Sequence, residues 1–165
     1  MGAERPPSVT AAAEELRGAG SVAELLGLTA ESLVELLDAP VCTISRVIGD
    51  LLVDLVQHRR AGKPDRLGHG YLISDFPLTR AVIETREPET VYTGDSSADR
   101  AETSLLAELG FDSLLMLAIE ADNTAWGLVE VYANGRRFDD FDVALARALV
   151  AEAGQVLERL SSPSH

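Results

Sequence analysis

The chain has 165 residues, enough for one domain with a single hydrophobic core. Its 27 acidic and 14 basic side chains give a formal net charge of −13, which repels phosphate backbones and anionic membranes and excludes nucleic acid as an expected partner. No apolar run approaches the roughly 20 residues of a membrane helix, and the N-terminus lacks a signal-peptide pattern. With a single cysteine, Cys42, the sequence predicts a cytoplasmic protein without an internal disulfide.

The N-terminal half predicts helices followed by a β-hairpin. Ser21 and Glu24 form a capping-box pattern ahead of apolar residues at helical spacing, and Pro40 ends that helix. The β-branched residues that follow are interrupted by the turn sequence Gly49-Asp50, which is typical of two antiparallel strands. The predicted elements are a short helix over 10–17, a helix over 22–37, strands over 41–48 and 51–58, and a loop over 59–66.

The C-terminal half is centred on a second hairpin. Residues 112–120 are almost continuously apolar, as in a strand covered on both faces. The turn residues 121–124 join them to a return strand over 126–132. The other predicted elements are a weak strand over 68–74, a helix over 75–87 with Asp75 as its N-cap, a strand over 90–93, a helix over 101–109 and a long helix over 139–160.

Taken together, these elements resemble those of a known family. The stretches PVCTISRVIGD, DFPLTRAVIETREPETVYTGD and LLAELGFDSLLMLAIEADNTAWGLVEVYANGRRFDDFDVALARALV are similar to a GAF domain of the actinobacterial signalling type. The resemblance implies an α+β fold, with an antiparallel sheet of five or six strands and the terminal helices on one face. Short helices and loops would roof a small-molecule pocket on the other face. We expect a tail with a short helix over 1–20, one GAF-like domain over 21–160 and a C-terminal tail over 161–165.

Several functional branches of this family carry marks that the chain lacks. Members that reduce methionine sulfoxide use cysteine pairs, and bilin-binding members attach their chromophore through a cysteine in the later half of the domain. Cys42 stands alone and early, and it is expected in the core. Residues 134–140 differ from the Asn-Lys-Phe-Asp-Glu signature of cyclic-nucleotide binders and predict a strand-to-helix turn. His69 is the one candidate haem ligand, and an exposed edge histidine explains it more simply. The cofactor therefore stays unknown.

Catalytic and metal-binding patterns are weak. The three histidines are scattered, and no nucleophile has a base at a recognisable spacing. Asp95, Asp99 and Glu102 could gather a cation, but a solvated loop and helix start explain them better. We therefore expect no enzyme and no metal site.

One strand face predicts a binding site. Alternation places Trp126, Leu128, Glu130 and Tyr132 on one face, with smaller apolar residues facing the helices. Glu130 is informative because a carboxylate on a central strand must be partnered or line a cavity, and Arg46 or Arg80 could pair with it. The further candidate wall positions are Tyr71, Phe76, Thr79, Tyr92 and Met116. The alternative is that these side chains fill a closed core without a ligand.

The sequence thus predicts a non-catalytic regulatory domain that binds a small molecule and signals as a homodimer. The alternative is a ligand-free module for protein interaction or dimerisation. The dimer is expected through the helices Val22–Leu37 and Asp139–Leu160, because the last helix is more widely apolar than one sheet face requires. Ala144, Leu145 and Ala148 add small or apolar surface at its flanks.

Overall fold

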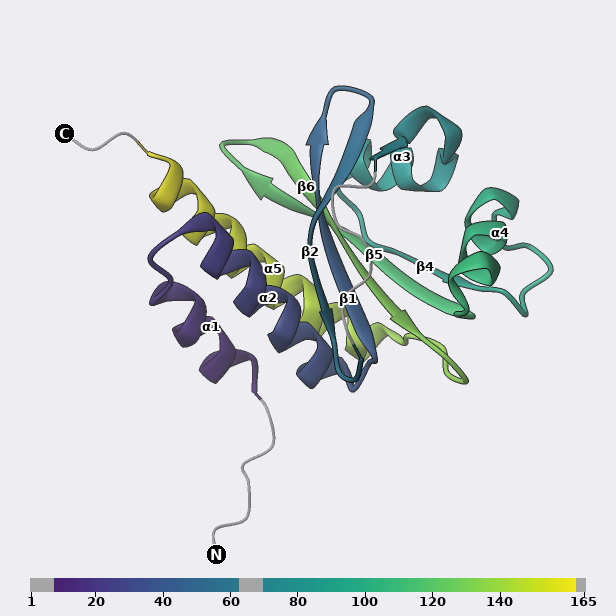
Figure 1. Ribbon diagram of the computed structural model, residues 1–165, viewed down its shortest axis with the longest axis horizontal. Coiled ribbons are helices and arrows are strands. Elements are labelled where there is room, and N and C mark those ends of the chain that lie inside the picture. The colour runs from purple at the N-terminus through teal and green to yellow at the C-terminus, as the bar shows by residue number, and fades with distance from the viewer. Residues whose placement is uncertain (1–7, 63–69, 163–165) are drawn as a thin grey trace, which may run out of the picture.

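The computed structural model describes residues 8–62 and 70–162 (Figure 1). Within these residues, six strands form one antiparallel sheet in the order β3-β2-β1-β6-β5-β4. The strands are β1 (Val41–Ile48), β2 (Leu51–Arg59), β3 (Gly70–Leu72), β4 (Glu89–Tyr92), β5 (Ser113–Ala121) and β6 (Thr124–Ala133). The helices are α1 (Val9–Arg17), α2 (Val22–Leu37), α3 (Pro77–Thr85), α4 (Arg100–Leu109) and α5 (Asp140–Ser161), with a 3-10 helix η1 (Ile73–Asp75). The predicted α+β class, with its antiparallel sheet, is confirmed.

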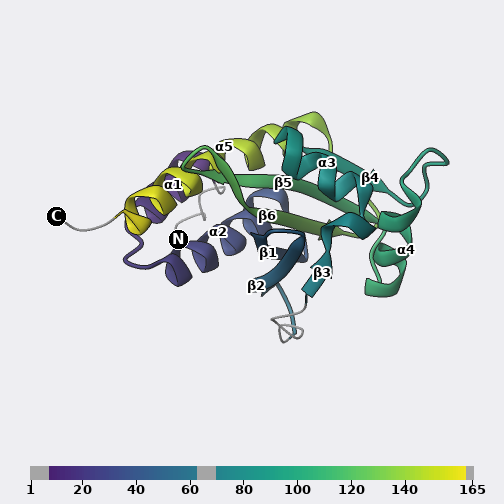
Figure 2. The same cartoon turned by 90° about the horizontal axis from the view of Figure 1, so that it is seen from above.

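The helices form two groups on opposite faces of the sheet. Figures 1 and 2 show α1, α2 and α5 together at one side of the molecule, with α3 and α4 at the other. The helices α2 and α5 pack on each other and on the sheet, and α1 packs on both of them. This arrangement leaves the second sheet face to the short helices.

Each face of the sheet has its own hydrophobic core, because successive side chains of a strand point to opposite faces. Leu115 and Leu117 of β5 belong to the core under α2 and α5. Their neighbours Leu114 and Met116 belong to a smaller core on the other face, which includes Val82 of α3. A strand covered on both faces was expected from the apolar run of β5, and the structure confirms it.

The helix side contains one very close backbone approach. A Cβ atom at Gly154 of α5 would lie 2.2 Å from the carbonyl oxygen of Glu120, so only glycine lets this helix lie so close to β5. The helical Gly27 of α2 is different, because nothing lies within 4 Å of the corresponding position.

The connection from β6 to α5 is fixed by an arginine. Arg136 donates a hydrogen bond of 2.6 Å to the carbonyl oxygen of Leu37, which is the last residue of α2. Its guanidinium also pairs with Asp142, which forms a capping box with Asp139 at the start of α5. One side chain therefore holds the end of α2 against the beginning of α5.

The segment between β2 and α3 differs in secondary structure from the sequence prediction. The strand predicted over 68–74 ends at Leu72, and a 3-10 helix follows. The predicted N-cap Asp75 lies within that 3-10 helix, and α3 begins at Pro77, whose fixed φ suits a first helical turn. Part of the predicted loop over 59–66, the start of the predicted strand and the candidate haem ligand His69 lie outside the described residues.

Candidate functional site

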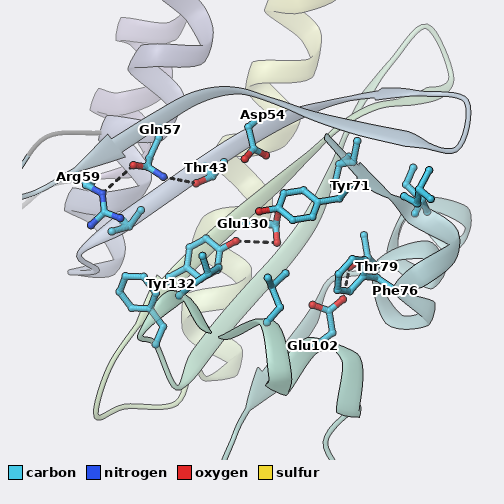
Figure 3. Close-up of a pocket in the computed structure, with 17 residues that line it drawn as sticks. Thr43, Asp54, Gln57, Arg59, Tyr71, Phe76, Thr79, Glu102, Glu130 and Tyr132 are labelled. Carbon is cyan, nitrogen blue, oxygen red and sulfur yellow. Dashed lines mark hydrogen bonds between the residues drawn. The ribbon is translucent and has the colours of Figure 1, made fainter. Parts of the chain in front are cut away.

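A cavity of about 290 Å³ lies between the sheet and the short helices α3 and α4 (Figure 3). Its lining comes from β1, β2, β3, β6, η1, α3, α4 and the loops beside them. The apolar and aromatic lining residues are Val41, Leu52, Tyr71, Leu72, Ile73, Phe76, Leu105, Leu109, Phe111 and Tyr132. The polar lining residues are Thr43, Asp54, Gln57, Arg59, Thr79, Glu102 and Glu130. A cavity that combines apolar and aromatic walls with convergent polar groups has the character of a small-molecule site.

Glu130 occupies the middle of the cavity floor (Figure 3). It lies on β6 between Thr43 of β1 and Met116 of β5, and its side chain is largely buried, with the residue only 8% exposed. The Tyr132 hydroxyl donates a hydrogen bond of 3.1 Å to its Oε2 atom. Burial raises the pKa of Glu130 to about 8, and the nearby carboxylates Glu102 and Asp54 add to the rise. Near neutral pH this carboxyl group is therefore largely protonated.

A second buried carboxylate faces the cavity from α4. Glu102 is 1% exposed, and the Thr79 hydroxyl of α3 donates a hydrogen bond to it. Burial raises the pKa of Glu102, and the hydrogen bond from Thr79 opposes that rise. The same hydroxyl lies 3.4 Å from the sulfur of Met116 below it. This cluster ties α3 to α4 and to the sheet.

The opposite end of the cavity is formed by β2. Figure 3 shows Arg59 and Gln57 at this end, away from Glu102. The Arg59 Nε donates to the Gln57 side-chain oxygen at 2.9 Å, and the Gln57 amide contacts the Thr43 hydroxyl at 3.5 Å. Asp54, from the same strand, accepts a hydrogen bond of 2.6 Å from Ser45. Among the described residues, the cavity thus has acidic groups from three elements and one arginine at its β2 end.

The family model of the GAF domain matches residues 21–157, which is most of the chain. The chain belongs to the GAF domain family. Comparison with the curated proteins found no match.

Solved structures share this GAF fold at low sequence identity. The far-red absorbing dark state of JSC1_58120g3 with bound biliverdin IXa is 16% identical with a TM-score of 0.80, over 93% of this chain and 99% of that one. The bacteriophytochrome RpBphP3 from R. palustris is 13% identical with a TM-score of 0.82, over 92% of this chain and 36% of that one. The chromophore-binding domain of Stigmatella aurantiaca phytochrome P1 is 17% identical with a TM-score of 0.74, over 94% and 59% of the two chains. This GAF domain therefore spans about a third of the bacteriophytochrome's length.

Four of the nine predicted site residues line the cavity. They are Tyr71, Phe76, Thr79 and Glu130. The Tyr71 and Phe76 rings meet edge to face, with centroids 6.1 Å apart. Met116 lies beneath the cavity, fully buried against Thr79, and is not part of the lining.

The other four predicted residues lie away from the cavity. Trp126 is the extra residue of a β-bulge, because Ile119 pairs with Gly127 while Glu120 pairs with Ala125. It packs against the core under α2 and α5, so the prediction that it shares a face with Glu130 is wrong.

The two arginines predicted to pair with Glu130 have other partners. The Arg46 guanidinium stacks over the Trp126 ring at 4.4 Å and donates to the Trp126 carbonyl oxygen at 2.7 Å. Arg80 is exposed and forms an ion pair of 2.8 Å with Glu84, one helical turn further along α3. The predicted pairing is wrong, since Glu130 accepts its hydrogen bond from a tyrosine.

Tyr92 is the last of the four. Its ring lies 4.3 Å from the guanidinium of Arg137, which also forms an ion pair of 2.6 Å with Asp95. This cluster fixes the loop before α4 and does not line the cavity.

The site residues of β2 and α4 were not predicted from the sequence. Asp54, Gln57 and Arg59 lie on β2, where buried and exposed residues do not alternate strictly. The sequence pattern therefore did not indicate that these three residues line the same cavity. Glu102 was assigned to a solvated helix start, and that assignment is wrong because the residue is buried. A signal was present: leucines follow Glu102 at helical spacing, at positions 105, 106 and 109, and this pattern places it on the inward face of α4.

The remaining chemistry is sparse in the part of the chain that the structure describes. No three metal-ligating side chains gather there. Nor does any described helix have the length and apolarity needed to span a membrane. Cys42 is buried in the core under α2 and α5, and burial raises the pKa of its thiol well above the usual range.

Proposed function

We propose that this GAF domain is a non-catalytic regulatory module that binds a small molecule in the cavity under α3 and α4. The supporting observation is the cavity itself, about 290 Å³ in volume, with two largely buried carboxylates that a closed apolar core would not require. The biliverdin bound in a structural neighbour supports a ligand-binding role for the fold. A non-catalytic role is supported by the lining, since no cysteine, histidine or serine is among its described residues.

The ligand that we propose is smaller than a bilin. A cavity of about 290 Å³ is at the lower limit of typical ligand pockets, whereas a bilin contains four pyrrole rings. The cysteine Cys42 is in the core on the opposite face of the sheet, where it cannot reach the cavity to form a thioether bond. The residues present therefore do not fit a covalently attached bilin.

Native mass spectrometry of the freshly purified full chain tests the proposed function. We expect a co-purified small molecule, or, for the empty protein, fragment binding that shifts the methyl NMR signals of Val41, Leu52 and Ile73 in the cavity. The methyl signals of Leu149, on the helix side, serve as the control because they should not move. A protein with no bound mass and no cavity shifts in a broad fragment screen would contradict the proposal.

We further propose that the domain acts as a homodimer in the cytoplasm, through the helix layer of α2 and α5. Phe141, at the start of α5, is 71% exposed, and small exposed residues follow it along the same face at positions 144, 148 and 151. Small side chains permit close helix approach, and a stable interface buries about 1,000 Å² or more. A single buried cysteine suits a reducing compartment. The alternative function, a ligand-free interaction module, would use this same face.

Sedimentation velocity tests the dimer. Each subunit has a net charge of −13, so association should strengthen as salt screens the repulsion. Ala148→Glu, at an exposed position of α5, should shift the protein to a monomer without changing its unfolding midpoint. A wild-type monomer at micromolar concentration in both low and moderate salt would contradict the proposal.

A further inference from the structure

Acidic side chains outnumber basic ones among the described residues of the cavity lining. Glu130 of β6, Glu102 of α4 and Asp54 of β2 face one cavity from three separate elements. Among the described lining residues, Arg59 is the cation, and it lies at the β2 end with Gln57 as a hydrogen-bond partner. Burying carboxylates so close together is costly unless something positively charged or protonated compensates for them.

The side-chain hydrogen bonds to the two most buried carboxylates come from hydroxyl groups. Tyr132 donates to Glu130, and Thr79 donates to Glu102. A hydroxyl donates one hydrogen bond and neutralises no charge, whereas a carboxylate has acceptor sites for about four. Both carboxylates line the cavity, so a ligand can supply further donors.

Aromatic and apolar surfaces surround this acidic centre. The Tyr71 and Phe76 rings meet edge to face on one wall, and the Phe111 and Tyr132 ring centroids are 5.3 Å apart on another. Aromatic faces favour flat apolar groups and cations. The space therefore suits a flat body beside a donor-rich head group.

We propose, on the basis of the proposed function, that the ligand of this cavity is a nitrogen-rich organic cation with a flat apolar body. An amidine, a guanidinium or a protonated amino-heterocycle has the required planar set of N–H donors, and Glu130 and Glu102 receive it. The same lining disfavours ligands whose buried part is anionic, which includes the phosphate group of a nucleotide, because ionisation of Glu130 or Glu102 would repel that charge.

Binding of such a cation depends on pH in a defined direction. Burial and the neighbouring carboxylates raise the pKa of Glu130 to about 8, so the free protein must release a proton before the cation binds. The affinity for a cation that stays charged should increase about tenfold from pH 7 to pH 9 and level off above that. The other titratable or charged groups along the cavity are Glu102 on α4, Asp54 and Arg59 on β2, Tyr71 on β3 and Tyr132 on β6. Burial raises the pKa of both tyrosines, which therefore stay neutral over this range.

Three probes of nearly equal shape test the inference on the full chain. Benzamidine is cationic, benzamide is neutral and benzoate is anionic, and each has the same flat ring. Methyl NMR titration of Val41, Leu52 and Ile73 gives both the location and the dissociation constant for each probe. We expect benzamidine to bind at least about tenfold more tightly than benzamide, the loss expected for one charge-assisted hydrogen bond, and benzoate to bind most weakly.

Variants then assign the selectivity to the named carboxylates. Glu130→Gln and Glu102→Gln should each weaken benzamidine binding about tenfold and leave benzamide binding nearly unchanged. Glu84→Gln, on the exposed side of α3, is the matched control and should change neither. The pH profile of the wild-type protein needs no variant and checks the same carboxyl group.

The outcomes separate the inference from the proposed function. Benzamide or benzoate binding in the cavity as tightly as benzamidine would overturn the cation preference while leaving a small-molecule site. A benzamidine affinity that does not rise between pH 7 and pH 9 would overturn the role assigned to the Glu130 carboxyl group in that preference. Absence of cavity shifts with all three probes, in a protein that also purifies without a bound mass, would overturn both.

Discussion

Glu130→Gln should change how the stability of the protein depends on pH. Glutamine keeps an acceptor for the Tyr132 hydroxyl and nearly the same shape, but it does not titrate. The variant therefore removes one proton equilibrium from the folded state and leaves the hydrogen bond in place. A comparison of the two proteins isolates the free energy of ionising this one group.

The magnitude follows from the pKa difference of Glu130. Its pKa is about 8 in the folded protein, against an ordinary value of 4.5. Between these pH values the folded state holds a proton at Glu130 that the unfolded state has released, so the wild-type protein loses stability as the pH rises. A difference of about 3.5 pKa units sets an upper bound of about 5 kcal/mol, at 1.36 kcal/mol per unit. We expect about 2–5 kcal/mol.

Urea unfolding at several pH values from 4.5 to 9 measures this effect. The variant and the wild type should differ by less than about 1 kcal/mol at pH 4.5, and the variant should become progressively more stable up to about pH 8. General charge repulsion, from a net charge of −13, affects both proteins and cancels in the difference. Glu84→Gln should follow the wild-type curve throughout. Parallel curves for Glu130→Gln and wild type would refute the assignment of a buried, protonated carboxyl group.

Three further expectations follow from the packing. In urea unfolding, Gly154→Ala should destabilise the protein by at least about 1–3 kcal/mol, because its methyl group would meet the Glu120 carbonyl oxygen. Gly27→Ala should instead stabilise it by up to about 1 kcal/mol, because that position is open. Equal effects of the two substitutions would contradict the close approach of α5 to β5. Cys42 should react slowly with a thiol reagent in the native state and readily in denaturant, and rapid native labelling would show that it is not buried. Arg136→Ala should cost about 1–3 kcal/mol, because it removes a partly buried ion pair and a carbonyl contact, while Arg80→Ala, which removes an exposed ion pair, should cost clearly less; the reverse order would be inconsistent with their environments.

The candidate site was only partly predictable. Glu130 was found because a carboxylate on an otherwise apolar central strand needs a reason to be there, and that argument depends on local sequence alone. Its partner was predicted wrongly, because any arginine near the same face was a candidate and only the packing of α3 sends Arg80 toward solvent. Glu102 was missed because its burial depends on how α4 lies over the sheet.

The sequence by itself determined the class of fold and the order of its elements. Alternating and continuous apolar runs define the strands, capping residues such as Ser21 define helix starts, and these signals act between residues close together in the chain. The amino-acid composition also determined the strongly acidic net charge and the lack of cysteine pairs.

Only the tertiary structure decided which side chains meet in the cavity. A single β-bulge turns Trp126 to the helix side of the sheet, and no local sequence pattern predicts that bulge. The acidic centre brings together Asp54, Glu102 and Glu130 from three elements far apart in the sequence. The pKa of Glu130 is raised by its burial and by repulsion from the other two carboxylates. Both effects exist only once the chain has folded, because both depend on distances through space.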